Sequence, residues 1–251
     1  MAKVRIQKAL ARAGVASRRV VEEMLLDGRV TVNGKLVTDV PCFIDPETDD
    51  VRVDGRSVRK QEPRKVYYLL NKPKKVVCTQ RDPEGRPRAV DLIPDVPQRV
   101  YCVGRLDADS TGLVLLTNDG DLTQFLTHPR HGVEKTYVVE IEGRLDENEV
   151  QQLKEGVWLD GRPGSGAQVR VLRRNPKRSL LQITLTEGRN REIRRTLARL
   201  GHKVRRLKRT AIGPITDKGL KIGSHRRLRA REVEKLWRSG RQWLKQGDGN
   251  E

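Results

Sequence analysis

The sequence predicts an α+β fold, in which a small N-terminal domain precedes a larger domain built on a mainly antiparallel, mixed β-sheet with flanking helices. The chain has 251 residues, 35% of them hydrophobic, which is enough to bury a core in one large or two small domains. After residue 66, strand-like runs outnumber helical ones and short turns join most of them. The charged segment RKQEPRK, residues 59–65, predicts a linker between domains 1–60 and 66–239.

Two short helices are predicted near the N-terminus. Apolar residues recur at helical spacing over residues 6–13, and Gly14 can end that helix. Ser17 can cap a second helix, which Asp27-Gly28 ends. Several basic residues of this segment lie off the apolar faces, so a compact helical unit with a basic outer surface is expected.

Two β-hairpins are predicted after these helices. Val30 and Val32 alternate with other residues and precede Asn33-Gly34, which is a strong hairpin signal. In the run VRVDGRSV, Asp54-Gly55 is predicted to be the turn of the second hairpin. The first domain is therefore expected to close just before the linker.

The larger domain is predicted to contain strands at VYYLL, RVYCVG, GLVLLT, TYVVEIEG, VRVL and LLQITL. Helices are predicted only around residues 147–156 and 192–200. Asn118-Asp119-Gly120, after GLVLLT, predicts a turn. Residues 240–251 are expected to form a flexible tail.

The charge of the chain predicts a polyanionic partner. It has 52 Lys and Arg against 33 Asp and Glu, a formal net charge of +19, which is unlike an enzyme of small metabolites. Between Glu187 and Arg238 there are 18 Lys or Arg and five acidic residues, so most of the excess lies there. The predicted helix over 192–200 would add the partial positive charge of its N-terminus for phosphate.

Neither a membrane segment nor a metal module is indicated. No run of eighteen apolar residues occurs, and MAKVRIQKAL lacks the apolar region of a signal peptide, so a cytoplasmic location is expected. Cys42, Cys78 and Cys102 form no Cys-x-x-Cys pair, which argues against a zinc module and a disulfide framework. We expect them to be small buried residues.

Asp107 is the acidic residue that the predicted fold does not explain. The stretch GRLDADSTGLVLLTNDG starts at residue 104, and its Asn118 and Asp119 belong to the predicted turn. Asp107 precedes the strand with no turn partner and no obvious helix to cap. Beside Arg105, in a basic groove, its carboxylate is expected to stay ionised, and phosphate repels it. Its expected target is therefore an electrophilic carbon or a hydroxyl, with Asp107 as nucleophile or base.

A metal site is the alternative for these carboxylates. It would use Asp107, Asp109, Asp119 and Asp121, whose spacing does not match a calcium loop. A metal-dependent nuclease would lose its activity to a chelator, whereas indifference to chelation is expected here. We therefore predict no metal.

Tyr137 is predicted to face inward. The run KTYVVEIEG alternates with period two, which places Tyr137, Val139 and Ile141 on one face of a strand. From the sequence pattern alone, Tyr137 is expected to be a packed core aromatic.

The motifs together resemble a known family. The run RIQKALARAGVASRRVVEEMLLDGRVTVNGKLV looks like an S4 RNA-binding domain. The runs YYLLNKPKKVV, VGRLDADSTGLVLLTNDGDL, EKTYVV and EGRNREIRRTLARLGHKVRRLKR follow it. Over nearly the whole chain, the sequence is similar to the RsuA/RluB group of bacterial ribosomal RNA pseudouridine synthases. The resemblance implies an S4 domain at 1–60 and a pseudouridine synthase catalytic domain at 66–239.

The resemblance implies roles for the residues at matching positions. Asp107 takes the place of the essential catalytic aspartate, and Arg105 belongs to its loop. Tyr137 takes the place of the tyrosine that stacks on the target base. Arg194 matches the basic residue that pairs with the catalytic carboxylate, and Ile193 matches an apolar residue that helps to line the pocket.

Other basic residues are implied to contact RNA or to compete for these roles. Arg191 and Arg195 are close enough in sequence to replace Arg194 beside Asp107. Glu192 stands where related sequences often carry Gln, and a carboxylate there could pair with a neighbouring arginine. The residues expected to bind RNA are Arg191 and, in the S4 helix pair, Arg5, Lys8, Arg18 and Arg19.

The implied activity is the isomerisation of a uridine to pseudouridine in ribosomal RNA. The N1–C1′ bond breaks, the base turns, and it rejoins through C5, so no cofactor is expected. The expected partner is a stem-loop of 23S rRNA, bound by a monomer, and a synthase of small-subunit 16S rRNA (RsuA-like) is one alternative. A non-catalytic rRNA-binding assembly factor is the other alternative, but it would be expected to lack Asp107, Tyr137 or Arg194, and all three are present.

Overall fold

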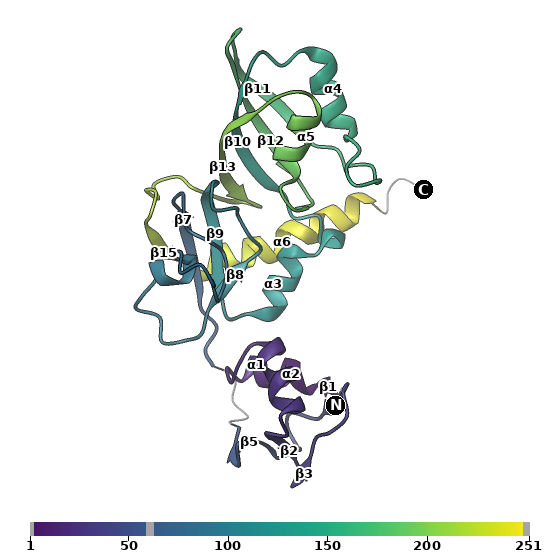
Figure 1. The fold of residues 1–251 in the computed structure, drawn as a ribbon, viewed down its shortest axis with the longest axis vertical. Coiled ribbons are helices and arrows are strands. Elements are labelled where there is room, and N and C mark those ends of the chain that lie inside the picture. The colour runs from purple at the N-terminus through teal and green to yellow at the C-terminus, as the bar shows by residue number, and fades with distance from the viewer. Residues whose placement is uncertain (1–2, 59–62, 248–251) are drawn as a thin grey trace. The chain divides into compact units, whose positions relative to one another are not determined.

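The computed structural model describes residues 3–58 and 63–247, and the chain divides into two compact units (Figure 1). The first comprises the residues up to Val66 together with Pro97–Arg99, and the second comprises Tyr67–Val96 and the residues from Val100 onward. Residues 59–62 of the expected linker lie outside the described residues.

The first unit begins with the two predicted helices, α1 (Ile6–Arg12) and α2 (Arg18–Leu26). The predicted cap of α2 is confirmed, because the Ser17 hydroxyl accepts a hydrogen bond from the backbone N–H of Val20 at 3.2 Å. Gly14 has a φ of +83°, which suits the chain reversal after α1. One face of each helix is buried against the strands of this unit.

Both predicted hairpins are present in the first unit. Asn33-Gly34 and Asp54-Gly55 all have positive φ, as a two-residue hairpin turn requires. The hairpin strands form a four-stranded sheet in the order β3-β2-β5-β6, and a separate pair joins β1 to β4. The strands are β1 (Val4–Arg5), β2 (Val30–Val32), β3 (Lys35–Leu36), β4 (Phe43–Ile44), β5 (Val51–Val53) and β6 (Arg56–Ser57).

The second unit is built on a nine-stranded mixed sheet. Seven of its strands follow the order β11-β12-β10-β13-β9-β7-β15, and the other two are β14, which pairs with β13, and β8, which pairs with β9. The β9–β13 pair is parallel, and the other strand pairs of the described residues are antiparallel. The α+β fold and the mainly antiparallel sheet are therefore confirmed. The strands are β7 (Tyr67–Lys72), β8 (Tyr101–Val103), β9 (Thr111–Thr117), β10 (Lys135–Glu142), β11 (Gln168–Arg174), β12 (Arg178–Leu185), β13 (Val204–Ile212), β14 (Ile215–Thr216) and β15 (His225–Arg227).

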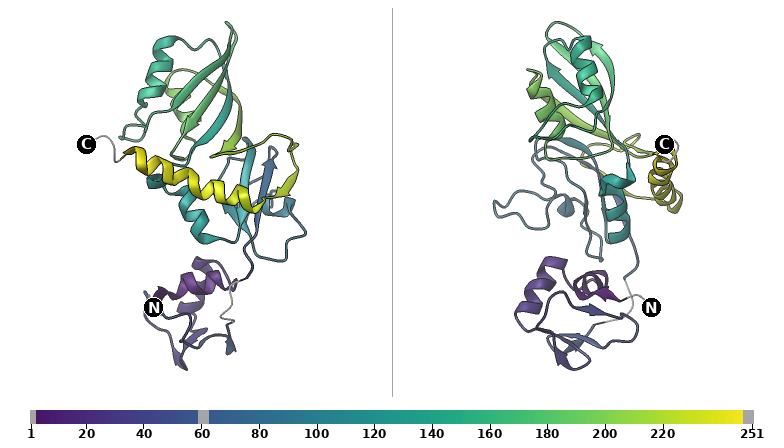
Figure 2. Two further views of the ribbon diagram at one scale, coloured as in Figure 1. Left: turned by 180° about the vertical axis from the view of Figure 1, so that it is seen from behind. Right: turned by 90° about the vertical axis from the view of Figure 1, so that its right-hand side faces the viewer.

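Four α-helices flank this sheet. They are α3 (Gly120–Thr127), α4 (Glu147–Glu155), α5 (Glu192–Arg199) and α6 (Ala230–Gly247). Helices α3 and α6 lie side by side and share a core with the middle strands, which includes Leu113, Leu115, Phe125 and Leu236 (Figure 2). Helix α4 contacts β11, and α5 contacts β13 (Figure 1). Their positions agree with the two predicted helices.

The predicted turn at Asn118-Asp119-Gly120 is instead the start of α3. The Asp119 carboxylate accepts the backbone N–H groups of Asp121 and Leu122, as an N-cap does. Asp119 also accepts a hydrogen bond from the Tyr67 hydroxyl at 2.9 Å. Apolar side chains at helical spacing, among them Leu122 and Phe125, bury the helix against the sheet. An Asp-Gly pair is ambiguous, because aspartate serves both hairpin turns and helix caps.

Helix α6 corrects the expected tail. The helix runs through Gly240 to Gly247, so part of the segment expected to be flexible is helical, and residues 248–251 lie outside the described residues. Gly240 does not end the helix but allows it to pack closely. A Cβ atom there would lie 2.6 Å from Cζ of Phe125 and 2.8 Å from the carbonyl oxygen of His131.

Strand β13 was not predicted either. Its sequence, VRRLKRTAI, buries Leu207, Arg209 and Ile212 among exposed or half-buried residues. A buried arginine interrupts the apolar alternation by which strands are recognised. The cysteines also differ from expectation, because Cys42, Cys78 and Cys102 are free but half-buried.

Candidate active site

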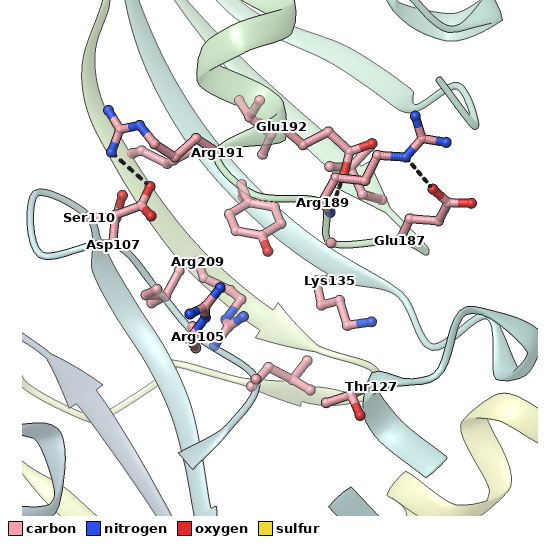
Figure 3. Close-up of a pocket in the computed structure, with 18 of the residues that line it drawn as sticks. Arg105, Asp107, Ser110, Thr127, Lys135, Glu187, Arg189, Arg191, Glu192 and Arg209 are labelled. Atoms are coloured by element: carbon pink, nitrogen blue, oxygen red, sulfur yellow. Dashed lines mark hydrogen bonds and ion pairs between the residues drawn. The ribbon is translucent and has the colours of Figure 1, made fainter. Parts of the chain in front are cut away.

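A cavity of about 280 Å³ opens in the second unit between the loop before β9, the segment before α5 and the face of β10 and β13. Small-ligand sites span roughly 300–1,000 Å³, so this cavity suits a group about as large as one nucleobase. Figure 3 shows Asp107, Arg191, Lys135 and Arg209 around it. Its polar lining consists of Arg105, Asp107, Ser110, Thr127, Lys135, Tyr137, Glu187, Arg189, Arg191, Glu192 and Arg209.

Asp107 lies at the edge of this cavity on a short structured loop. Gly104, with a φ of +70°, turns the chain out of β8, and Leu106 is buried at 8% exposure. The carbonyl oxygen of Asp107 accepts the backbone N–H of Ser110 at 3.1 Å, which closes a turn. The backbone of this loop is thus fixed on both sides of Asp107, and 28% of its side chain stays accessible.

Two arginines surround the Asp107 carboxylate. Its Oδ2 lies 3.2 Å from Nη1 of Arg191 and 4.0 Å from Nε of Arg194. Both arginines also reach Oδ2 of Asp109, at 3.5 and 3.2 Å respectively. Arg195, the third candidate from the sequence, pairs with Asp160 instead. Arg194 therefore lies beside the Asp107 carboxylate, and Arg191 lies closer to it than Arg194 does.

The two arginines differ in how they are held. The side chain of Arg194 is only 13% exposed, and its Nη2 donates to Oγ of Ser110 at 3.3 Å and to the carbonyl oxygen of Asp109 at 3.4 Å. The side chain of Arg191 is 43% exposed and starts α5 from a left-handed backbone conformation, with φ +48°. Arg194 is thus a fixed support beneath the loop, whereas Arg191 faces the cavity edge.

Glu192 shapes the turn that presents Arg191. It is buried at 8% exposure, and its Oε2 accepts the backbone N–H of Arg189 at 2.9 Å. Burial raises the pKa of this carboxyl. The sequence predicted that Glu192 could pair with a neighbouring arginine, but its carboxylate accepts a backbone N–H group, and no ion pair joins it to an arginine within the described residues. The Arg189 guanidinium itself pairs with Glu187 at 3.1 Å.

Tyr137 lines the cavity, and its predicted inward orientation is confirmed by an exposure of 8%. In the β10–β13 ladder, Tyr137 lies directly opposite Arg209. Lys135 precedes Tyr137 by two residues in the same strand and so shares its face. Ile193 also lines the cavity, as expected. An aromatic ring, a lysine and an arginine therefore line one side of the cavity.

Lys135 makes the stability of the protein depend on pH. Burial, and then repulsion from Arg209, lower its pKa from 10.5 to about 8. Between about pH 8 and 10.5 the unfolded chain therefore binds a proton here that the folded chain does not, so the free energy of unfolding rises with pH. Lys135→Met is expected to abolish this rise in urea unfolding measured at several pH values. An unchanged slope would contradict the prediction.

The predicted RNA-binding residues of the first unit are accessible. Arg5, Arg18 and Arg19 are exposed, and Lys8 is half-buried. The guanidinium of Arg5 lies 5.9 Å from the centre of the Phe43 ring, in cation–π geometry. Arg105 belongs to the second unit, where it is exposed at the cavity.

Three basic residues of the cavity, Lys135, Arg189 and Arg209, were not predicted as site residues. The alternation that oriented Tyr137 would also have placed Lys135 on its face. Arg189 lies within the recognised EGRNRE run. Arg209 had no such signal, because its place depends on a strand pairing between residues far apart in the sequence.

Neither a membrane-spanning helix nor a metal-binding cluster occurs among the described residues. No helix there is long and apolar enough to cross a membrane. No group of three or more His, Cys, Asp or Glu side chains in this part of the chain is arranged to hold a metal ion.

The fold and site define a class of protein, an RNA-binding unit joined to a catalytic unit with an aspartate at a nucleobase-sized cavity. The family described as RNA pseudouridylate synthase matches residues 66–199, and the S4 domain matches residues 4–40. The chain belongs to the RNA pseudouridylate synthase family and is an RNA pseudouridine synthase with an N-terminal S4 domain.

Individual relatives cover almost the whole chain. An uncharacterised RNA pseudouridine synthase of Aquifex aeolicus (strain VF5) is 44% identical, over 95% of this chain and 96% of the relative. The ribosomal large subunit pseudouridine synthase B of Bacillus subtilis (strain 168) is 40% identical, over 92% and 95%. A crystal structure of a pseudouridylate synthase superposes with a TM-score of 0.68 at 32% identity, over 93% of this chain and 99% of that one.

Proposed function

We propose that this protein converts a specific uridine of large-subunit (23S) ribosomal RNA to pseudouridine, with Asp107 as the catalytic group. One observation carries the proposal. The accessible carboxylate of Asp107, held by Arg191 and Arg194, lies at the edge of a cavity that Tyr137 also lines. The name of the Bacillus subtilis relative supports the large subunit as the source of the substrate. The enzyme is expected to act as a cytoplasmic monomer.

The uridine must leave its stack to reach this cavity. Extrusion of a base costs a few kcal/mol, and stacking on an aromatic ring returns about 1–3 kcal/mol. Tyr137 supplies such a ring, and Ile193 adds apolar contact beside it. Phosphates that flank the uridine are bound by exposed basic residues of the second unit such as Arg105, and Arg18 and Arg19 of the first unit bind phosphates elsewhere in the RNA.

Asp107 has three chemical routes to break the N1–C1′ bond. Its carboxylate can attack C1′ of the ribose, attack C6 of the uracil, or remove a proton from the sugar as a base. In each route the N1–C1′ bond breaks, the base turns, and C5 bonds to C1′ and gives up its hydrogen while N1 gains one. The net change is an isomerisation. The fixed loop and the two arginines keep the carboxylate charged and aimed for any of the three.

Arg194 and Arg191 are expected to serve Asp107 differently. Arg194→Ala removes a buried support and leaves polar groups of the loop unpaired, so kcat is expected to fall by about 10² to 10³. Arg191→Ala removes a half-exposed side chain that also faces RNA, so a loss of about tenfold is expected, with part of it in KM. Single-turnover rates and RNA affinities measure both. A larger kcat loss for Arg191→Ala would reverse the assignment.

Mapping of pseudouridines in rRNA, from cells with and without the gene, tests the proposed function. One site in 23S rRNA is expected to disappear and to return with the wild-type gene but not with an Asp107→Asn gene. Loss of a 16S site would move the substrate to the small subunit. An unchanged map, with altered ribosome assembly, would favour a non-catalytic assembly factor.

A further inference from the structure

Arg209 is a buried cation whose guanidinium is only partly satisfied. The residue is 4% exposed, and its Nε donates to the carbonyl oxygen of Leu113 at 2.7 Å. Its Nη2 is buried without a hydrogen-bond partner. Buried donors are nearly always paired, so an unpaired N–H group on a residue that lines the cavity points to an acceptor on the substrate.

The position of Arg209 relative to Tyr137 is fixed by the sheet. The two residues are register partners on the antiparallel strands β10 and β13, so their side chains leave the sheet side by side. Both line the cavity. Figure 3 shows both Arg209 and Lys135 at the cavity. A base stacked on the Tyr137 ring would therefore present its edge to the guanidinium of Arg209.

The charges around the cavity leave Arg209 available for the base. Arg191 is paired with Asp107 and Arg189 with Glu187, at 3.2 and 3.1 Å. No ion pair joins Arg209 to a carboxylate within the described part of the chain. Repulsion between Arg209 and Lys135 contributes to the lowered pKa of Lys135. A ligand that gains negative charge would relieve this repulsion.

We propose that Nη2 of Arg209 donates a hydrogen bond to a carbonyl oxygen of the extruded uracil and stabilises the negative charge that the base carries during isomerisation. The inference rests on the proposed function and adds a second catalytic residue on the side of the cavity formed by β10 and β13. Arg209 binds a carbonyl oxygen of the uracil, whereas Asp107 reacts with the ribose or with C6 of the uracil.

The chemistry requires such a group on every route open to Asp107. If C1′ is attacked, or a ribose proton is removed, the electron pair of the N1–C1′ bond stays on the uracil, which becomes an anion delocalised onto O2 and O4. If C6 is attacked, the C5–C6 pair moves toward C4 and O4 becomes an enolate oxygen. The charge disappears when C5 bonds to C1′, C5 loses its proton and N1 gains one. Hydrogen-bond donors that point at the charge of a transition state, in a site with little water, raise the reaction rate strongly.

A substrate and enzyme double-substitution cycle tests the inference. Synthetic stem-loops carry uridine, 2-thiouridine or 4-thiouridine at the mapped target, and single-turnover rates are measured with wild type and Arg209→Met. We expect Arg209→Met to lower the uridine rate by roughly 10²-fold. Sulfur is a poorer acceptor, so one of the two thio substitutions is expected to slow wild type about tenfold more than it slows the variant. Equal thio effects in both proteins would overturn the inference.

Matched variants keep this test decisive. Arg178→Met makes the same change on β12, where Arg178 is 63% exposed and pairs with Glu140, and it is expected to leave all three rates unchanged. If Arg209→Met fails to fold by circular dichroism, Arg209→Lys takes its place in the cycle, because it keeps a charge but cannot hold the same two-point geometry. A wild-type protein that makes no pseudouridine would refute the proposed function itself. An active wild type without the coupling refutes only the role of Arg209.

Discussion

Asp107→Asn is expected to abolish pseudouridine formation, lowering the single-turnover rate by about 10⁴ or more, while RNA affinity stays within about threefold of wild type. Asparagine has nearly the same shape, and its amide oxygen can still accept from Arg191, which lies 3.2 Å from the carboxylate. It cannot form an ester with C1′, add to C6 or accept a proton as a base. Release of tritium from C5 of labelled uridine in the RNA measures turnover, and filter binding measures affinity.

Asp109→Asn is the matched control for Asp107→Asn. Asp109 contacts the same two arginines, with Oδ2 at 3.5 Å from Arg191 and 3.2 Å from Arg194, but it does not line the cavity. The control removes one carboxylate from the arginine cluster without touching the proposed reacting group. A loss of less than about tenfold is expected. Normal turnover by Asp107→Asn, or equal losses in the two variants, would refute Asp107 as the catalytic group.

Local signals in the sequence predicted local structure well. Ser17 was identified as a cap, and Asn33-Gly34 and Asp54-Gly55 as hairpin turns, because each depends on a few adjacent residues. The cap of α3 was missed because Asp119 is followed by Gly120, and an Asp-Gly pair fits a turn equally well. Helix α6 was not predicted, and its part beyond Gly240 lies in the segment expected to form a flexible tail because chain termini are often loosely ordered.

The candidate site was predictable only in part, because some of its residues are placed by contacts between segments that are far apart in the sequence. Asp107 drew attention because nothing local explained an acid there, and the structure places it at the cavity. The choice between Arg191 and Arg194 depends on side-chain direction at the start of α5, which a left-handed residue decides. Arg209 joins the cavity through its register with Tyr137, and such pairings between distant segments have no local signature.

Gly112→Ala is expected to destabilise the catalytic unit by about 4 kcal/mol or more, a large part of the roughly 5–15 kcal/mol that holds a typical domain folded. Gly112 has a φ of +109°, and a Cβ atom there would lie 2.2 Å from the carbonyl oxygen of Arg209 and 2.6 Å from its nitrogen. Both clashing atoms are backbone in the parallel β9–β13 pair, where Gly112 is the register partner of Arg209. Neither strand can yield, because β13 is also paired with β10 and β9 with β7.

Gly219→Ala separates this steric clash from backbone strain alone. Gly219 also has a positive φ, +76°, but a Cβ atom there meets nothing within 4 Å, so only the conformational cost of about 1–2 kcal/mol is expected. Urea unfolding of both variants measures the difference, and a gap below about 1 kcal/mol would contradict the predicted clash. Because β9 leads out of the Asp107 loop and β13 carries Arg209, a partly separated pair would also move the proposed catalytic carboxylate away from the group proposed to hold the base. Any folded fraction of Gly112→Ala is therefore expected to bind RNA but to isomerise uridine slowly.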